Sequence, residues 1–266
     1  MALKEAIRTY HDLLTEELAA ESQGQLDEQM QQRGLFFGTR PLCTVLRPRF
    51  LTPEQYIFLR KSIRPLLRAF EKISELAVQD AGFGAQFGLL DWEEELIKHE
   101  PKYRGHTPLT RLDAFYVTDN SELKFTEYNA EVPAASAYND VLNEVFYGLP
   151  VMGEFLRKYA VRPLPTRHSV LHVLLDAYRQ SGGTTRPQIG ILDWNEVPTR
   201  SEFELFTQYF GSPGFAAKIV DPREVAYDNG RLHHDGFTID IIYKRVLITE
   251  LIERGGLDQP VVQAVR

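Results

Sequence analysis

Two segments of alternating polar and apolar residues, separated by a short polar turn, constrain the fold of this chain more than any other part of its sequence. Residues 109–117 and 123–129 alternate with the period of two that is typical of half-buried β-strands. Between them lie Asp119, Asn120 and Ser121, which favour a turn. The sequence therefore predicts an antiparallel β-hairpin with its turn centred on Asn120.

The hairpin carries four polar side chains that its register brings together. Side chains two apart on a strand share a face, so Arg111 and Asp113 point the same way. The same holds for Glu127 and Asn129. A turn centred on Asn120 sets Asp113 opposite Glu127, with Cβ atoms about 4.5–5.5 Å apart. The same register sets Arg111 opposite Asn129.

This set of side chains suits a bound cation. Two opposed carboxylates repel each other unless a cation lies between them. Two carboxylates and an amide oxygen suit Mg²⁺, which usually shares its coordination with phosphate oxygens. Arg111 is placed to neutralise charge on a transferring phosphoryl group. The competing interpretation is a solvated face on which Arg111 pairs with Asp113 or Glu127, and a register slip of one residue would separate the four groups.

The residues before the hairpin predict helices around one strand. An apolar stripe at helical spacing predicts an amphipathic helix over residues 3–32, with a break at 22–24. Residues 41–51 are apolar and predict a strand. Thr52 and Pro53 predict the start of a helix that runs to about residue 78, with a kink or break at Pro65. The stripe consists of Leu3, Ile7, Tyr10, Leu14 and Leu18.

The second half of the chain alternates helix and strand. Pro163 and Pro165 indicate a domain boundary, after which helices at 169–179 and 201–210 alternate with strands. This alternation is typical of a Rossmann-like α/β layer. The predicted strands are 188–193, 217–220 and 239–245. The fold class predicted for the whole chain is therefore mixed α/β, with an antiparallel sheet element and a Rossmann-like part.

Composition excludes several classes of function. The 266 residues carry a net charge of −7, which argues against unspecific binding to nucleic acid. The chain holds one cysteine, Cys43, which sits in an apolar run and is expected to be a buried small residue rather than a nucleophile. No apolar stretch approaches the ~18 residues that span a bilayer, and the amino terminus lacks the core of a signal peptide. We therefore expect a cytoplasmic protein that binds neither nucleic acid nor membrane.

Several motifs together resemble a known family. Arg111-Leu-Asp113, followed by Phe125-Thr-Glu127-Tyr-Asn129-Ala-Glu-Val-Pro133, is similar to the Arg-x-Asp and Glu-x-Asn strands of the circularly permuted ATP-grasp ligases. This is the group of glutathionylspermidine synthase and eukaryotic glutathione synthetase. The later segment Ile239-Asp-Ile-Ile-Tyr243-Lys-Arg245 looks like the family's Tyr-x-Arg strand. The resemblance implies an ATP- and Mg²⁺-dependent ligase that joins a small-molecule or peptide carboxylate to an amine through an acyl phosphate.

The resemblance also implies roles for individual residues. Asp113, Glu127 and Asn129 match the family's magnesium ligands, and Arg111 matches its catalytic arginine, which contacts phosphate and acyl phosphate. The loop over 130–138 matches the one that receives the acid substrate. The expected substrate contacts are Ala134, Ala135, Ser136, Tyr243 and Arg245.

The family also needs lysines on the nucleotide phosphates, a mobile glycine-rich loop and a further carboxylate on magnesium, and no segment here supplies them. Gly182–Gly183 and Gly255–Gly256 suit helix C-caps better than phosphate loops. We therefore expect this chain to be part of a longer or split enzyme and to be inactive alone. The expected segments are an amino-terminal helix (1–34), a permuted ATP-grasp segment (35–163) and a truncated Rossmann-like pre-ATP-grasp domain (164–266).

The same sequence allows other interpretations. A non-catalytic ATP-grasp relative that binds a peptide or protein partner is the alternative function, and a homodimer is left open. His233–His234 is expected in a solvated turn rather than a metal site, and His168 and His172 on a helix surface. The aromatic stripe Phe203, Phe206 and Phe210 is expected in the core.

Overall fold

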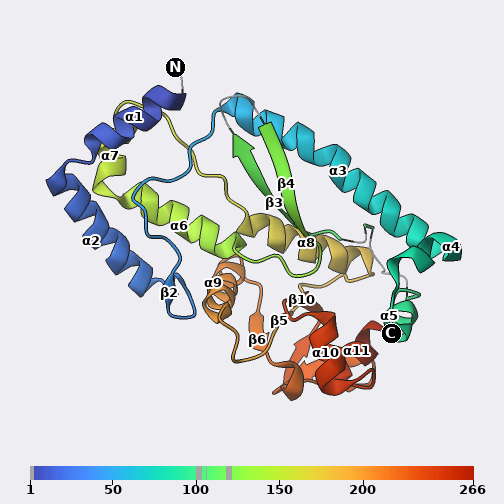
Figure 1. The fold of residues 1–266 in the computed structure, drawn as a ribbon. Helices are drawn as coiled ribbons and strands as arrows, with labels where there is room; N and C mark the ends of the chain where they lie inside the picture. Colours follow the sequence, from blue (N-terminus) through green and yellow to red (C-terminus); the bar gives the residue numbers. More distant parts are fainter. Residues whose placement is uncertain (1–2, 100–103, 106, 118–121) are drawn as a thin grey trace. The chain divides into compact units, whose positions relative to one another are not determined.

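The computed structural model describes residues 3–99, 104–105, 107–117 and 122–266 (Figure 1). Contacts divide the chain into two compact units. The helical unit comprises Met1–Tyr56, Ala134–Ser169 and Glu196–Tyr209. The sheet unit comprises Ile57–Pro133, Val170–Asn195 and Phe210–Arg266. The predicted segments at 1–34, 35–163 and 164–266 follow the family resemblance, whereas the two units follow contacts. The predicted segments therefore stay a prediction.

The helical unit is organised around helix α7. The helices α1, α2 and α6 all pack against α7. A short hairpin, β1 with β2, follows α2. Helix packing buries a core that includes Tyr10, Leu26, Met30, Leu35, Val145, Val151, Met152 and Phe155. The elements are α1 (Leu3–Leu13), α2 (Glu16–Gln32), β1 (Phe36–Phe37), β2 (Arg40–Pro41), α6 (Ser136–Gly148) and α7 (Pro150–Leu156).

Two predictions for this unit are wrong. The amino-terminal helix breaks at Leu14, because Thr15 caps a new helix by accepting a hydrogen bond from Leu18 N at 3.3 Å. The predicted break at 22–24 lies inside α2, where Ser22 is buried and its hydroxyl accepts a hydrogen bond from Val151 N. Residues 42–51 form no strand; Phe50 stacks on Phe155 of α7 instead, and Leu46 O accepts a hydrogen bond from Tyr10 Oη at 2.8 Å.

Gly24 offers a test of this helix. Its position in α2 is open, and a Cβ there would meet no atom within 4 Å. Gly24→Ala is therefore expected to raise the free energy of unfolding by about 0.8 kcal/mol, because alanine loses less backbone entropy in a helix. Urea denaturation measures the change. Gly230→Ala is the control, since that site is equally open but has φ +76°, so the same substitution there should destabilise the protein.

The sheet unit contains a parallel three-stranded sheet. Its strand order is β10–β5–β6, with Ile191 paired to Tyr243 on one side and to Ile219 on the other. Helices α8 and α9 precede β5 and β6, which confirms the predicted alternation. Phe203, Phe206 and Phe210 on α9 have no exposed surface, as predicted. The strands are β5 (Ile189–Leu192), β6 (Ala217–Val220) and β10 (Ile241–Lys244). The helices α8 (Arg167–Gln180) and α9 (Arg200–Gly211) begin in the helical unit and end in the sheet unit.

An antiparallel meander of three strands lies between β6 and β10. Two tight turns join its strands, at Asn229–Gly230 and Asp235–Gly236, and all four of these residues have positive φ. Such two-residue turns match the twist of antiparallel strands. Helix α11 packs on β7 and β8. The elements are β7 (Ala226–Asp228), β8 (Arg231–His234), β9 (Phe237–Ile239), α10 (Ile248–Gly255) and α11 (Pro260–Val265).

The long helix α3 (Pro53–Gln79) packs on the hairpin formed by β3 (Arg111–Val117) and β4 (Glu122–Asn129) (Figure 1). Two aromatic stacks hold the sheet unit's part of the helix to the strands: Phe58 on Tyr116, with ring centroids 5.8 Å apart, and Phe70 on Tyr128, at 4.1 Å. Thr52 caps the helix, as predicted. The helix is continuous through Pro65, so no break occurs there.

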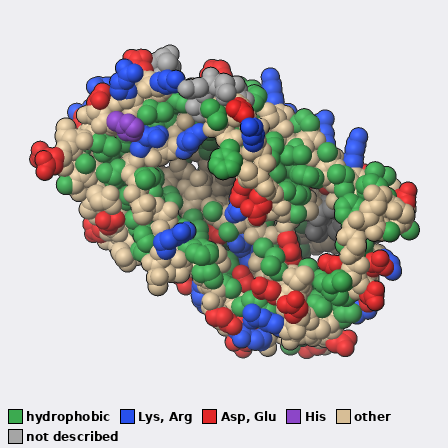
Figure 2. All heavy atoms as spheres, in the orientation of Figure 1, with side chains coloured by type: hydrophobic (Ala, Val, Ile, Leu, Met, Phe, Trp, Pro, Cys, Tyr) green, Lys and Arg blue, Asp and Glu red, His purple; other side chains and the backbone are tan. Residues whose placement is uncertain are grey.

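Short elements complete the sheet unit: α4 (Ala81–Gly84), a 3-10 helix (Ala85–Phe87), α5 (Asp91–Leu96) and a second 3-10 helix (Pro222–Glu224). Among the described residues, no helix has both the length and the apolar character needed to cross a membrane. On the face drawn in Figure 2, acidic and basic side chains lie among hydrophobic ones.

Candidate functional site

The hairpin has the predicted register at the end that carries its polar residues. Arg111 pairs with Asn129, and Asp113 pairs with Glu127. Beyond Asp113 the register shifts by one residue, because Thr126 forms a β-bulge that leaves Ala114 opposite Phe125. The predicted turn at 119–121 lies outside the described residues. The register therefore confirms the expected juxtaposition, and the bulge was not predicted.

Arg111 binds the side chains of Asp113 and Asn129. Its Nε donates to Asp113 Oδ1 at 2.8 Å, and its Nη2 donates to Asp113 Oδ2 at 3.2 Å and to Asn129 Oδ1 at 3.3 Å. The side chains of Arg111 and Asp113 remain 39 % and 38 % exposed. This is one of the two pairings anticipated for a solvated face, and it also leaves the whole set accessible to a ligand.

The donor set of this face suits Mg²⁺ in part. Asp113, Glu127 and Asn129 offer only oxygen ligands, as a hard cation prefers. Arg111 occupies one lone pair on each oxygen of Asp113, and a carboxylate retains further lone pairs. Within the described parts of the chain, no three His, Cys, Asp or Glu side chains cluster closely enough to hold a metal ion. A metal here would need oxygens from a ligand as well.

An exposed apolar strip continues the polar face. Phe115 and Val117 follow Asp113 at intervals of two on β3, and they are 72 % and 48 % exposed. A large aromatic side chain this exposed is a candidate surface for a planar ligand. The period of two on this strand places Phe115 on the same face as Asp113, but Phe115 was not predicted as a site residue.

The segment after β4 is tied to the end of strand β10. Glu131 Oε1 accepts hydrogen bonds from Ile248 N, at 2.7 Å, and from Lys244 Nζ. Arg245 Nη1 donates to Pro133 O. Burial lowers the pKa of Lys244, and the contact with Glu131 opposes that shift. Glu131 therefore links the polar end of the hairpin to the start of α10, and neither it nor Lys244 was predicted as a site residue.

The carboxyl edge of the parallel sheet gathers further charges. Asp193 directly follows β5, Asp221 follows β6, and Arg245 follows β10; all three are buried. Burial raises the pKa of Asp221, but hydrogen bonds from Arg223 and Asn195 outweigh it and hold this pKa at about 2. This edge is where open α/β sheets bind ligands. The carboxylates were not predicted as site residues, although Asp193 ends one predicted strand and Asp221 directly follows another.

Tyr243 and Arg245 lie together at this edge. The guanidinium carbon of Arg245 is 5.5 Å from the centre of the Tyr243 ring, and its Nη1 is 3.4 Å from Tyr243 Oη. Both side chains are buried, at 4 % and 6 % exposure. Their role in substrate binding stays a prediction.

Asp193 makes the sheet unit sensitive to pH. Burial raises its pKa from 3.8 to about 6, while the Trp194 N–H and the charge of Arg245 oppose the rise. Between these two values the unfolded chain loses a proton that the folded protein keeps, so stability falls as pH rises. The displacement corresponds to about 3 kcal/mol. Urea denaturation from pH 4 to 7.5 should show this loss in the wild type and not in Asp193→Asn. Identical pH profiles would contradict it.

Residues 134–138 of the predicted substrate loop belong to the helical unit, and residues 130–133 belong to the sheet unit. Ala135 adopts φ 83°, which turns the chain into α6 at Ser136. The buried Glu202 accepts a hydrogen bond from Ala137 N at 3.1 Å, so a carboxylate of the protein already occupies one N–H at this helix start. Ser136 O accepts a hydrogen bond from Thr166 Oγ1 at 2.9 Å. Substrate contacts of Ala134, Ala135 and Ser136 stay a prediction.

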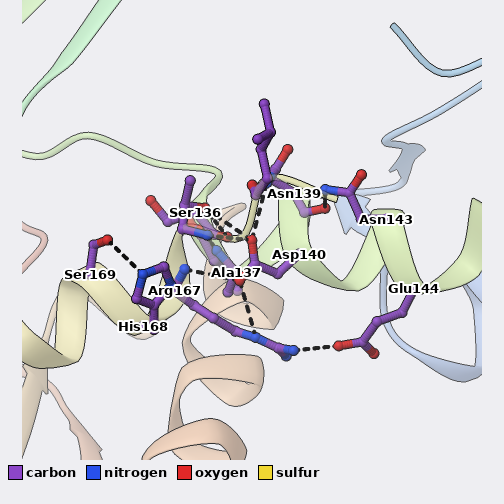
Figure 3. A network of polar contacts seen from close by, with 12 residues as sticks. Ser136, Ala137, Asn139, Asp140, Asn143, Glu144, Arg167, His168 and Ser169 are labelled. Atoms are coloured by element: carbon purple, nitrogen blue, oxygen red, sulfur yellow. Dashed lines mark hydrogen bonds and ion pairs between the residues drawn. The ribbon is translucent and has the colours of Figure 1, made fainter. Parts of the chain in front are cut away.

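A polar network centred on Asp140 lies beside this loop (Figure 3). Asp140 accepts hydrogen bonds from Thr166 N at 2.7 Å and from Arg167 N at 3.0 Å, and thereby caps α8. The guanidinium of Arg167 extends from Asp140 to Glu144, as Figure 3 shows, and stacks over Tyr209 at 4.8 Å. Asp140 is 5 % exposed. The network fixes α6 against the start of α8.

The remaining histidine and cysteine predictions need two corrections. His234 lies in strand β8 rather than in a solvated turn; it is 7 % exposed, and its Nε2 is 3.1 Å from Glu224 Oε2. His233 points to the other face, near Asp228. Cys43 is half-buried rather than buried. His168 and His172 lie exposed on α8, as predicted.

Comparison with known proteins gives a resemblance of fold. No protein-family model and no curated protein matches the sequence. Among solved structures, the chain is similar to a glutathione synthetase-like effector (GSS30) from Globodera pallida in its apo form, with a TM-score of 0.58 and 13% sequence identity. The match covers 94% of this chain and 63% of that chain, so the chain spans less than two thirds of that structure. The predicted fold class is confirmed: the chain has a mixed α/β, glutathione synthetase-like fold.

Proposed function

We propose that this chain supplies part of an ATP- and Mg²⁺-dependent carboxylate–amine ligase of the circularly permuted ATP-grasp type. The observation that carries the proposal is the hairpin register, which sets Asp113 against Glu127 and Arg111 against Asn129 on an accessible face. The similarity of fold to a glutathione synthetase-like protein supports it. The remaining parts of the enzyme, and the cytoplasmic location, belong to the proposal.

In the proposed reaction, an oxygen of the substrate carboxylate attacks the γ-phosphorus of ATP, and ADP leaves. The substrate amine then attacks the acyl phosphate carbon, loses a proton and expels phosphate. Asp113, Glu127 and Asn129 would hold Mg²⁺. The bound ion would offset negative charge on the phosphate oxygens. Arg111 exchanges its contacts with Asp113 for the transferring phosphoryl group, whose charge a guanidinium stabilises.

The hairpin's neighbours within the sheet unit have supporting roles in this proposal. Glu131 and Pro133 tie the end of β4 to Lys244 and Arg245, which fixes the direction in which the chain leaves the polar face. Phe115 offers its exposed ring to the nucleotide base. Tyr243 and Arg245 contribute to the acid or nucleotide cleft.

Hydroxylamine trapping tests the reaction class without knowledge of the amine. The complete protein is incubated with Mg²⁺–ATP, hydroxylamine and a panel of amino-acid and peptide carboxylates. An acyl phosphate intermediate yields a hydroxamate with stoichiometric release of ADP, and omission of ATP or Mg²⁺ abolishes both. ADP release without hydroxamate across the panel would count against ligation through an acyl phosphate.

A non-catalytic module is the second candidate, and one observation favours it. Arg111 already neutralises Asp113, as expected of a face that holds no metal. Calorimetric titration with Mg²⁺–ATP separates the two candidates. No heat of binding at millimolar nucleotide would favour the module that binds a peptide or protein partner.

A further inference from the structure

The helical unit contains a large cavity that the ligase proposal does not use. Its volume is about 820 Å³, which lies in the range of small-molecule sites. The lining residues come from α1, the segment before α3 and the first turn of α3, α6, α7 and the segment before α8. Every one of them belongs to the helical unit. The cavity is therefore complete within a single unit.

An aromatic cluster forms one wall of the cavity. Phe50 stacks on Phe155 with ring centroids 5.1 Å apart, and Phe155 stacks on Tyr159 at 4.6 Å. Tyr10 supports the cluster from behind by edge contacts with Phe50 and Phe155. Phe155 is 1 % exposed, so the accessible rings of this wall are those of Phe50 and Tyr159. Aromatic side chains held in place by such packing suit an aromatic ring system.

The charges of the lining favour an anion. Arg49 and Arg162 both line the cavity and are solvent-exposed, whereas Glu54 is the one acidic side chain among the lining residues. The charges therefore sum to +1. Asn139 and Asn143 of α6 add polar groups that can hydrogen-bond a ligand. An aromatic wall in a lining of net positive charge matches a molecule with an aromatic body and a single negative charge.

We propose that this cavity binds a small aromatic monoanion: one or two fused or linked rings that carry one carboxylate or sulfonate. The rings lie against Phe50 and Tyr159, and the anionic group lies between Arg49 and Arg162. The proposal is independent of nucleotide binding, because the hairpin with Arg111 belongs to the sheet unit.

Two matched fluorescent probes test both halves of the proposal. 8-Anilino-1-naphthalenesulfonate carries the charge, and N-phenyl-1-naphthylamine is its neutral counterpart. Arg49→Ala and Arg162→Ala should each weaken binding of the sulfonate about fivefold, as expected for one charged contact at a partly exposed site. Binding of the neutral probe should stay within about twofold. Arg157→Ala, at an exposed arginine of the same unit that does not line the cavity, is the control and should change neither.

Filling the cavity provides the second arm. Ala160 and Leu164 line it and are exposed, so Ala160→Trp and Leu164→Trp add bulk without disturbing the core. Circular dichroism verifies that each variant folds, and both probes should then lose most of their fluorescence. Undiminished fluorescence in both filled variants would place the probes elsewhere and overturn the site. Equal weakening of the two probes by the arginine variants would overturn the assignment of an anionic ligand.

Discussion

Asp140→Ala is expected to lower the free energy of unfolding by about 3 kcal/mol. The substitution removes the buried carboxylate that caps α8 and leaves two backbone N–H groups without their acceptor. The Thr166 hydroxyl keeps Ser136 O as its acceptor. It also leaves Arg167, whose side chain is 20 % exposed, without its buried counter-charge. Removing one partner of a buried charged network costs more than the network contributes, because the remaining groups stay desolvated. Urea denaturation at pH 7 measures the loss.

Glu144 provides a matched control for this prediction. It contacts the same Arg167, but its side chain is 46 % exposed, so Glu144→Ala should cost less than about 1 kcal/mol. Asp140→Asn should fall between the two, because the amide keeps one acceptor and presents a donor to groups that are themselves donors. If Asp140→Ala costs no more than Glu144→Ala, the network in Figure 3 is not what fixes α6 to α8.

The second large effect is expected at the hairpin. Asp113→Asn and Glu127→Gln should each reduce hydroxamate formation by the complete enzyme about 100-fold, because each removes a negative charge that would hold the metal on the transferring phosphoryl group. The affinity for Mg²⁺–ATP, measured by calorimetry, should fall with it. Both side chains are accessible, so the free energy of unfolding should change by less than about 1 kcal/mol.

Glu122 lies on the same hairpin and separates a specific effect from a general loss of negative charge. It pairs with Lys124 at 2.7 Å on the exposed surface. Glu122→Gln should leave both activity and Mg²⁺–ATP affinity within about twofold of the wild type. Near-normal turnover in the Asp113 and Glu127 variants would remove these residues from the chemistry, whatever reaction the protein catalyses.

The sequence predicted the hairpin because strand periodicity and a polar turn are local signals. The faces of Arg111 and Asp113 follow from a period of two, and the paired residues follow from the position of the turn. The bulge at Thr126 escaped prediction because it shifts the pairing beyond Asp113 without disturbing the residues that carry charge. Turn residues predict where a chain reverses direction, but they do not predict an extra, unpaired residue in one of the two strands.

The contacts that complete the candidate site leave no periodic signal. Glu131 and Lys244 are 113 residues apart, and Ala137 and Glu202 are 65 apart. Neither pair can be inferred from one sequence, because only tertiary packing brings them together. The strand predicted for the apolar run before Thr52 is wrong for a related reason: apolar composition indicates tertiary contact but not its partner, and here Phe50 contacts Tyr10 and Phe155 of helices rather than a neighbouring strand.

The way the chain passes between its two units limits how the protein can be divided. It changes unit after residues 56, 133, 169, 195 and 209, and α3, α8 and α9 each begin in one unit and end in the other. Any single cut between residues 57 and 195 therefore gives two pieces, each of which lacks sequence that the helical unit needs. Fragments cut at residue 163 should recover that unit's fold only when both pieces are present together. The helical unit is therefore best studied by reconstitution from two co-expressed fragments rather than by isolation of one continuous segment.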